Sequence, residues 1–398
     1  MKLIKKAFLV SSFCLLLMLG TQQVYAERVM NLYTLTSLVQ DTSDEQRAKL
    51  ANQLLWQLLV RVSGTAQVLE KMPPKNFSED PEAYLEHPNF RLWSDLSSAQ
   101  SLINQYSYTA TSQLLTLARG EQVTAQQLEL TFDEAGVKRL LRRLQAPVWD
   151  ANRPKVLFWV ALESRNGRTL ITPVSNEPLS KVLAGQSEER GIPYLLPDFT
   201  DNPASDTLFS DIWSGFTQQI INASAPYQPD AIAVGKIKAS GSSWHVEWHL
   251  YTGMSSILHS SSVNTLREAL QAGVYFTAEQ LSNRYASQVG EGAGTYKIMV
   301  ANVRQAKDYA AINNYLTGLS LTSKVRVVQS ADQHILYELT LRGGLDQLKA
   351  NLALNGRLKE ESFFSLQQAS NYSQEAVEVG QKNTQLDQAD AYFRWQAN

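Results

Sequence analysis

The sequence predicts a mixed α+β and α/β protein made of three small modules, and three observations support this prediction. A chain of 398 residues holds two to three domains at roughly 100–200 residues each. The hydrophobic content of 44% is ordinary for a globular protein. Segments with the two-residue alternation of strands are interspersed along the chain with segments of helical spacing.

The first predicted module, 27–150, combines several strands with a well-capped helix. Ser43 and Gln46 fit a capping box at the start of this helix, and Gly64 fits its carboxyl-terminal cap. Apolar residues at helical spacing predict the face that the helix buries. They are Ala51, Leu55, Leu58 and Val62. Alternating runs predict strands at 29–39, 104–118 and 126–132. A short basic helix after Asp133 completes the module.

The second predicted module, 151–289, is expected to be a small α/β sandwich. The run RPKVLFWVALES at 153–164 is nearly all apolar, as in a strand buried on both faces of a sheet. Helices are predicted at 179–190, 205–224 and 265–288. Further strands are predicted at 191–199, 229–240, 243–251 and 255–264. Strands that alternate with helices and end in a hairpin favour a mixed sheet with helices on its faces.

The third predicted module, 295–366, follows the glycine-rich break VGEGAG at 289–294. Its strand and helix patterns run in the order βαββαβ, which predicts a ferredoxin-like arrangement. The remaining residues, 367–398, are rich in Gln, Asn, Ser and Asp and predict a polar flexible tail. The final AYFRWQAN is an aromatic exception, interpreted as a loosely ordered terminus that could also dock on the module or on a partner.

The first 26 residues are typical of a cleavable secretory signal. Three lysines precede an apolar core of 13 residues, 7–19, and small residues Val24 and Ala26 stand at −3 and −1 of a cleavage site after Ala26. Cys14, the one cysteine of the chain, lies inside this core. The mature chain therefore has no thiol, which excludes disulfides, thiolate metal sites and cysteine nucleophiles. The protein is predicted to be periplasmic in a Gram-negative-type cell.

Charge gives no reason to expect nucleic acid as a partner. The formal net charge is −2, and loss of the three leader lysines, Lys2, Lys5 and Lys6, makes it −5. Nucleic-acid binding depends on basic surfaces, which this balance does not indicate. No apolar run after the leader approaches the roughly 18 residues of a membrane span, so the mature chain is predicted to have no transmembrane segment.

Recognised catalytic patterns are missing from the sequence. It contains no P-loop, no G-x-G-x-x-G, no H-E-x-x-H and no G-x-S-x-G pattern. The acidic stretch PDFTDNPASD holds Asp198, Asp201 and Asp206. We interpret it as a surface turn whose aspartates cap backbone amides, with an oxygen-rich calcium loop as the alternative. His87 and His334 are expected to be exposed or locally hydrogen-bonded. No cofactor is predicted.

The run WHVEWHL at 244–250 is the strongest hint of reactive chemistry. On a strand, His245, Glu247 and His249 share one face, and the two tryptophans share the other. The two histidines would lie about 13 Å apart at the backbone, too far for one ion on a regular strand. A metal site therefore needs His259 of the next predicted strand. If Trp248 pairs with Leu258, His259 joins the Glu247 face; if it pairs with Ile257, His259 joins the apolar face.

Several separated motifs resemble a family of exported Gram-negative proteins known as domain of unknown function number two thousand and sixty-six. They are LLVRVSG, RPKVLFWVALE, RGIPYLLPDFTD, DIWSGF, ASAPYQPDAIAVGKI and WHVEWHL. The resemblance covers nearly the whole mature chain and implies no activity or site residues, because the family has none established. The middle segment also resembles the amino-terminal α/β domain of periplasmic TolB, which implies a fold and no function.

Two kinds of function compete, and a third is a weaker option. The leading hypothesis is a non-enzymatic accessory or interaction module that binds another periplasmic or outer-membrane protein. The alternative is a metal-dependent or general acid/base hydrolase of a cell-envelope substrate. In that case Glu247 is the candidate catalytic residue, and His245, His249 and His259 are the candidate metal ligands. The third is capture of a ligand in a cleft between the second and third modules.

Overall fold

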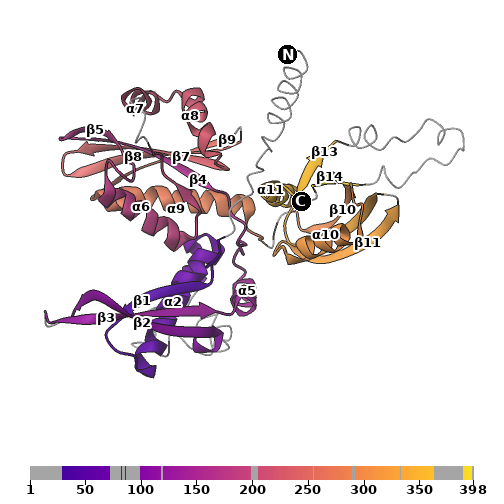
Figure 1. Ribbon diagram of the computed structural model, residues 1–398, viewed down its shortest axis with the longest axis horizontal. Helices are drawn as coiled ribbons and strands as arrows, with labels where there is room; N and C mark the ends of the chain where they lie inside the picture. Colours follow the sequence, from indigo (N-terminus) through magenta and orange to yellow (C-terminus); the bar gives the residue numbers. More distant parts are fainter. Residues whose placement is uncertain are drawn as a thin grey trace, which may run out of the picture.

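The chain is a mixed α/β protein with three sheets and several helices, so the predicted fold class is confirmed at this level (Figure 1). The computed structural model describes residues 29–71, 82, 86, 99–117, 120–198, 205–253, 255–288, 290, 292–331, 333–362 and 389–396. The leader, His87 and Asp201 lie outside these residues. No helix among the described residues has both the length and the apolar character needed to cross a membrane.

The first sheet is antiparallel and packs against the long helix that the capping pattern predicts. Its strands β1 (Thr34–Val39), β2 (Ile103–Thr116) and β3 (Gln122–Phe132) have the order β1-β3-β2. Helix α2 (Asp44–Ser63) begins where the Ser43 side chain accepts the Gln46 N–H, and it ends at Gly64, whose φ of 79° is left-handed. The predicted stripe of Ala51, Leu55, Leu58 and Val62 is buried. Helix α5 (Glu134–Arg143) is capped by Asp133, as predicted.

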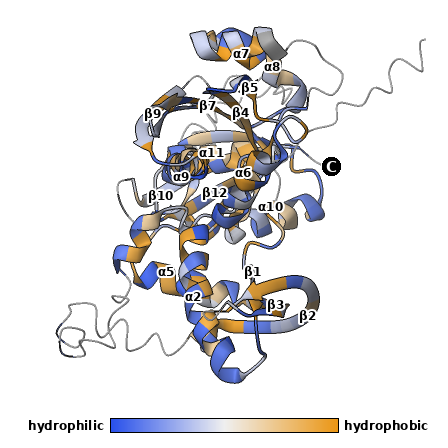
Figure 2. Ribbon diagram, turned by 90° about the vertical axis from the view of Figure 1, so that its left-hand side faces the viewer, coloured by the Kyte–Doolittle hydropathy of each residue, from blue (hydrophilic) through white to orange (hydrophobic). Residues whose placement is uncertain are grey.

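The central sheet is mixed and has helices on both faces (Figure 2). Its order is β5-β4-β7-β8-β9, and β6 pairs with one end of β4. The strands are β4 (Val156–Ser164), β5 (Gly167–Leu170), β6 (Tyr194–Leu195), β7 (Ala231–Ser240), β8 (Ser243–Thr252) and β9 (Ser255–Val263). Phe158 faces the core shared with α6 (Glu177–Arg190) and α9 (Leu266–Tyr285), whereas Trp159 faces the opposite core. The apolar run in β4 is thus buried on both faces, as predicted.

The opposite core is built by two short helices where the sequence predicts one. Helix α7 (Ser205–Ser214) ends at Gly215, whose φ is 76°, and α8 (Thr217–Ser224) starts two residues later. A left-handed residue cannot continue a right-handed helix, so the prediction of a single helix over 205–224 is wrong. The two helices pack mainly on β4 and β7. On the same face, β8 is half-covered through Tyr251, and the β9 side chains Ser256, Leu258, Ser260 and Ser262 are exposed.

The third sheet contains a strand that the sequence analysis did not predict. Its order is β11-β12-β10-β14-β13. The strands are β10 (Gly294–Ala301), β11 (Thr322–Ala331), β12 (His334–Leu341), β13 (Leu358–Glu361) and β14 (Ala391–Trp395), with helices α10 (Ala306–Gly318) and α11 (Leu345–Asn355). A four-stranded ferredoxin-like sheet would pair β13 with β10. Here β14 lies between them, parallel to β10 and antiparallel to β13.

The prediction that the chain ends in a flexible segment is therefore wrong for its last aromatic residues. Ala391, Phe393 and Trp395 alternate toward the core and are each at most 4% exposed. The backbone carbonyl of Trp395 accepts a hydrogen bond from Asn302 at 2.8 Å, and its indole donates to Asp308 at 3.3 Å. Burial of three apolar side chains outweighs the polar composition that precedes them.

A buried guanidinium connects the first sheet to the central one. Arg153 is fully buried, and its five N–H groups donate to backbone carbonyls over 2.9–3.1 Å. The acceptors are the carbonyl oxygens of Arg61, Trp149, Asp150, Arg190 and Gly191. Three of them belong to the carboxyl-terminal ends of α2 and α6, where helices leave carbonyls without intrahelical partners. One guanidinium thus donates hydrogen bonds to carbonyl groups at the carboxyl-terminal ends of two helices.

Neighbouring groups extend this connection to the third sheet. Arg190 donates to the Gly64 carbonyl at 3.0 Å, and Arg61 donates to the Glu189 carbonyl at 3.2 Å. The Asp150 carboxylate accepts the Ser320 N–H at 2.8 Å and pairs with Lys138 at 2.8 Å. The three sheets are consequently joined by buried or half-buried hydrogen bonds in addition to the chain itself.

Candidate functional site

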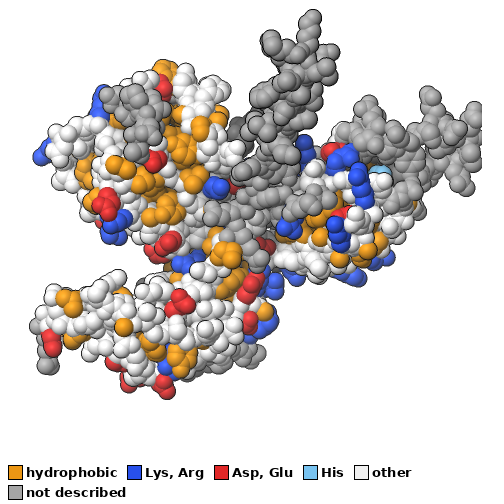
Figure 3. Space-filling model, viewed as in Figure 1, with side chains coloured by type: hydrophobic (Ala, Val, Ile, Leu, Met, Phe, Trp, Pro, Cys, Tyr) orange, Lys and Arg blue, Asp and Glu red, His pale blue; other side chains and the backbone are white. Residues whose placement is uncertain are grey.

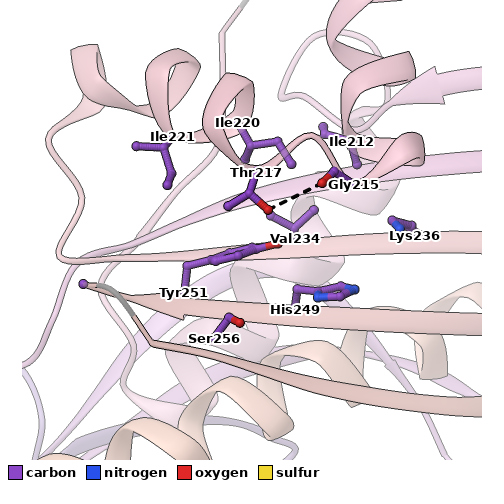
Figure 4. Close-up of a pocket in the computed structure, with 11 residues that line it drawn as sticks. Ile212, Gly215, Thr217, Ile220, Ile221, Val234, Lys236, His249, Tyr251 and Ser256 are labelled. Atoms are coloured by element: carbon purple, nitrogen blue, oxygen red, sulfur yellow. Dashed lines mark hydrogen bonds between the residues drawn. The ribbon is translucent and has the colours of Figure 1, made fainter.

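A pocket of about 520 Å³ lies beside helix α8, at the border between the covered and uncovered parts of the central sheet (Figure 4). Apolar side chains of α7, α8 and β7 form one wall: Ile212, Ile220, Ile221 and Val234. Polar side chains of β7, β8 and β9 form the other, Lys236, His249, Tyr251 and Ser256, and Thr217 of α8 lies beside the isoleucines. Gly215 and Gly253 complete the lining. The pocket is therefore mainly apolar on its helix side, with Thr217 as the polar exception, and mainly polar on its sheet side, with Val234 as the apolar exception.

The alternation of β8 explains why His249 and Tyr251 line this pocket and why Glu247 lies on the same face of the strand. Trp248 is fully buried on the other face, where its indole donates to the Ala269 carbonyl of α9 at 3.2 Å. A strand whose tryptophan is fixed in this way must present its alternate residues to the opposite face. His249 and Tyr251 therefore point toward α8, and their rings stack with centroids 6.1 Å apart.

Glu247 is an ionic bridge between two neighbours at the edge of the pocket. Its Oε1 lies 3.0 Å from Lys236 Nζ, directly across the β7–β8 pair, and 2.9 Å from His249 Nε2. The hydrogen bond from His249 lowers the pKa of Glu247, and Lys236 lowers it further against the opposing effect of partial burial. The carboxylate is thus held ionised, and the charges of Lys236 and Glu247 neutralise each other.

The other two candidate ligands are not brought to this group. His245 is exposed, with Lys238 and Ser262 as its cross-strand neighbours. His259 pairs with Trp248, a register that differs by one residue from the nearer of the two considered, and its ring stacks on Phe276 at 5.3 Å. Since directly opposite residues share a face, His259 lies on the apolar side. The three-imidazole cluster around Glu247 is therefore not formed.

Metal-ligand geometry is missing from the described part of the chain. No group of three or more His, Cys, Asp or Glu side chains there is close enough to hold an ion. In the acidic stretch, the backbone N–H of Asp198 donates to the hydroxyl of Tyr227 at 3.1 Å. Asp201 and the side chain of Asp206 lie outside the described residues, so the calcium-loop alternative stays a prediction.

Several residues that line the pocket were not predicted from the sequence, although the sequence holds a signal for one of them, Lys236. Lys236 meets Glu247 because Ser240 pairs with Ser243 around a two-residue loop that starts at Gly241, whose φ is 64°. Gly-Ser is a recognised two-residue hairpin loop, and such a loop fixes the pairing of every residue behind it. The isoleucines of α8 carry no comparable signal, because helical spacing predicts a buried face and not a pocket wall.

Comparisons with known proteins correct the family resemblance. Residues 26–150 match the model of a family described as a domain of unknown function (DUF8605). This family differs from domain of unknown function number two thousand and sixty-six, and the resemblance to the latter family is therefore wrong. A search of curated proteins gave no match.

Two solved structures are distantly similar. The Thermus thermophilus protein Y N-terminal domain is 12% identical, and the match covers 32% of this chain and 93% of that one with a TM-score of 0.16. An uncharacterized protein is 9% identical, over 33% of this chain and 97% of that one, with a TM-score of 0.15. Similarity this weak carries no argument about fold or function, and it gives no support to the likeness with TolB.

Proposed function

We propose that this chain is an exported, non-enzymatic binding protein of the cell envelope, and that the pocket beside α8 receives an uncharged side chain of a protein partner. The proposal divides the mature chain into modules at 27–150, 151–289 and 295–366, the last completed by β14. The observation that carries it is the pocket wall itself. Isoleucines line one side, and on the other side the charge of Lys236 is already neutralised by Glu247, which lies beside the pocket. A charged guest would have to break that pair, whereas an apolar group would not.

The lowered pKa of Glu247 favours a binding function over a hydrolytic one. A general acid or base works best when its pKa lies near the working pH. The pKa of Glu247 is instead lowered by His249 and Lys236, which both occupy the same carboxylate oxygen. His259, which the metal-dependent alternative requires, faces the other side of the sheet.

Site-specific cross-linking in whole cells tests the pocket. Benzoylphenylalanine at Ile221, a pocket residue that is 39% exposed, is expected to give one defined cross-linked product with a partner protein. The same photoreactive residue at Val174, which is 71% exposed and outside the pocket, is the control and is expected to give none. Equal products from both positions, or none from Ile221, would contradict the proposal.

Export has a separate test. The mature protein is expected to begin at Glu27, to lack Cys14, and to be released from cells by osmotic shock. The intact mass of the purified protein measures the first two, because loss of residues 1–26 removes the leader as a unit. A mass that includes the leader in the released fraction would show that the segment is not cleaved.

A further inference from the structure

Strand β9 forms an outer edge of the central sheet that lacks the usual protection against pairing. Its nine residues include no Asp, Glu, Lys, Arg or Pro. They pair with β8 without any register shift, from Trp244↔Val263 to Thr252↔Ser255. In the described part of the chain β9 is the last strand of its sheet. An edge of this kind presents a row of backbone donors and acceptors to solvent, ready to pair with another strand.

Edges of the third sheet show the protection that β9 lacks. Strand β11 carries Lys324 and Arg326 and has two register shifts against its neighbour. Strand β13 is four residues long and carries Lys359, Glu360 and Glu361. Figure 3 shows lysine and arginine side chains gathered over this part of the molecule. Charges, irregularity and shortness all oppose edge-to-edge pairing, and β9 instead exposes Ile257 by 43% and Leu258 by 56%.

The unprotected edge is continuous with the pocket. Ser256 of β9 lines the pocket and pairs directly with Tyr251. The residues of β9 that share this face are Ser256, Leu258, Ser260 and Ser262, as their pairing with β8 fixes. Three of them are small serines, so β9 builds no high wall between the pocket and the edge. Every second side chain of a strand added beside β9 would project over this same face.

We propose that β9 is the docking edge for an extended segment of the partner protein, whose backbone adds a strand to the central sheet. An aliphatic or aromatic side chain of that segment passes over Ser256 into the pocket, against the isoleucines of α8. This inference rests on the proposed function and adds the mode of binding. The guest side chain is uncharged, because Lys236 and Glu247 leave no net charge for it to match. A second copy of this chain fits less well, since β9 offers only Leu258 as an apolar side chain on the required face.

The test uses a phage-displayed library of random dodecapeptides, selected on the mature protein. Enriched peptides are expected to carry apolar residues at alternate positions, as strand addition requires. Leu258→Lys at the edge and Ile221→Lys in the pocket are each expected to weaken a selected peptide by about tenfold. Val174→Lys adds the same charge at an exposed position elsewhere and is expected to leave affinity unchanged. Amide exchange in β9 is expected to slow when the peptide binds, because its outward N–H groups become hydrogen-bonded.

The outcomes distinguish binding in the pocket from strand addition at β9. Loss of binding in Ile221→Lys alone, with no protection of β9, would keep the pocket and overturn strand addition. Failure of the library to yield a peptide, or equal weakening by Val174→Lys, would overturn strand addition as well. Sedimentation equilibrium that shows a dimer, abolished by Leu258→Lys, would assign the edge to a second copy instead. Circular dichroism melts of each variant check that these surface changes leave the fold intact.

Discussion

Replacing Arg153 with methionine is expected to lower the free energy of unfolding by roughly 4–5 kcal/mol. The change keeps most of the side-chain volume but removes every donor, which leaves the buried carbonyls of α2 and α6 without partners. Each buried carbonyl that loses its hydrogen bond costs about 1–3 kcal/mol, and partial relaxation limits the sum. The removed cation also neutralises the negative ends of two helix dipoles and lies 4.1 Å from the ring of Trp149. Urea unfolding of the mature protein measures the effect.

A surface arginine provides the control for this experiment. Arg168 pairs with Glu163 at 2.8 Å, but its side chain is 63% exposed, so Arg168→Met is expected to change stability by less than about 0.5 kcal/mol. Arg153→Lys should lie between the two, since an ammonium keeps the charge but has three donors in place of five. Equal losses from Arg153→Met and Arg168→Met would mean that the buried guanidinium does not hold the two helix ends together.

Features with local causes could be predicted from the sequence. The start and end of α2 depend on Ser43, Gln46 and Gly64, which lie next to the backbone groups that they satisfy. The double burial of β4 follows from its uninterrupted apolar run. The break at Gly215 was also readable, but the apolar spacing on both sides favoured one helix over two, and only the positive φ separates them.

The position of His259 shows that a shift of one residue in the β8–β9 register decides whether the predicted site forms. A predicted strand that ends at residue 251 leaves Thr252 in the hairpin loop, whereas in the structure Thr252 pairs with Ser255 and the loop starts at Gly253. Moving a hairpin loop by one residue shifts the facing pairs by two positions along the strand, and His259 therefore stays on the tryptophan face. The intermediate register, with Trp248 opposite Leu258, is the one that would have gathered three imidazoles around Glu247.

Non-local pairing could not be predicted in the same way. Strand β14 follows β13 after 29 residues, 362–390, and pairs with β10 as well as with β13. Nothing in the sequence AYFRW indicates which strand it pairs with. The same holds for Arg153, whose acceptors come from two helices that are distant in sequence. The polar composition of 367–398 predicted a tail for the first, and the apolar run at 153–164 predicted a buried strand that begins with the second, but neither pattern identifies the hydrogen-bonding partners.

The second large effect is expected at Gly273, where alanine should destabilise the protein by roughly 2–4 kcal/mol even though alanine favours helices by about 1 kcal/mol. Gly273 of α9 and Gly235 of β7 lie on either side of the Trp248 indole, and a Cβ at Gly273 would stand 2.1 Å from indole carbon Cε2. The indole cannot move away from the new methyl group, because its other side already packs against Gly235, which has no Cβ.

Gly185→Ala in α6 is the matched control. Nothing lies near its added methyl group, so helix propensity alone should stabilise the protein by about 0.5–1 kcal/mol.

A double-mutant cycle then ties the effect to the tryptophan. Trp248→Leu makes room for the new methyl group, so Gly273→Ala should cost much less in that background than in the natural chain. Thermal or urea unfolding of the four proteins gives the coupling free energy, expected to exceed about 1 kcal/mol. If the two changes were simply additive, contact with the indole would not explain the cost. In that event the orientation of β8, which places His249 and Tyr251 in the pocket wall, would need another cause than the packing of Trp248 between two glycines.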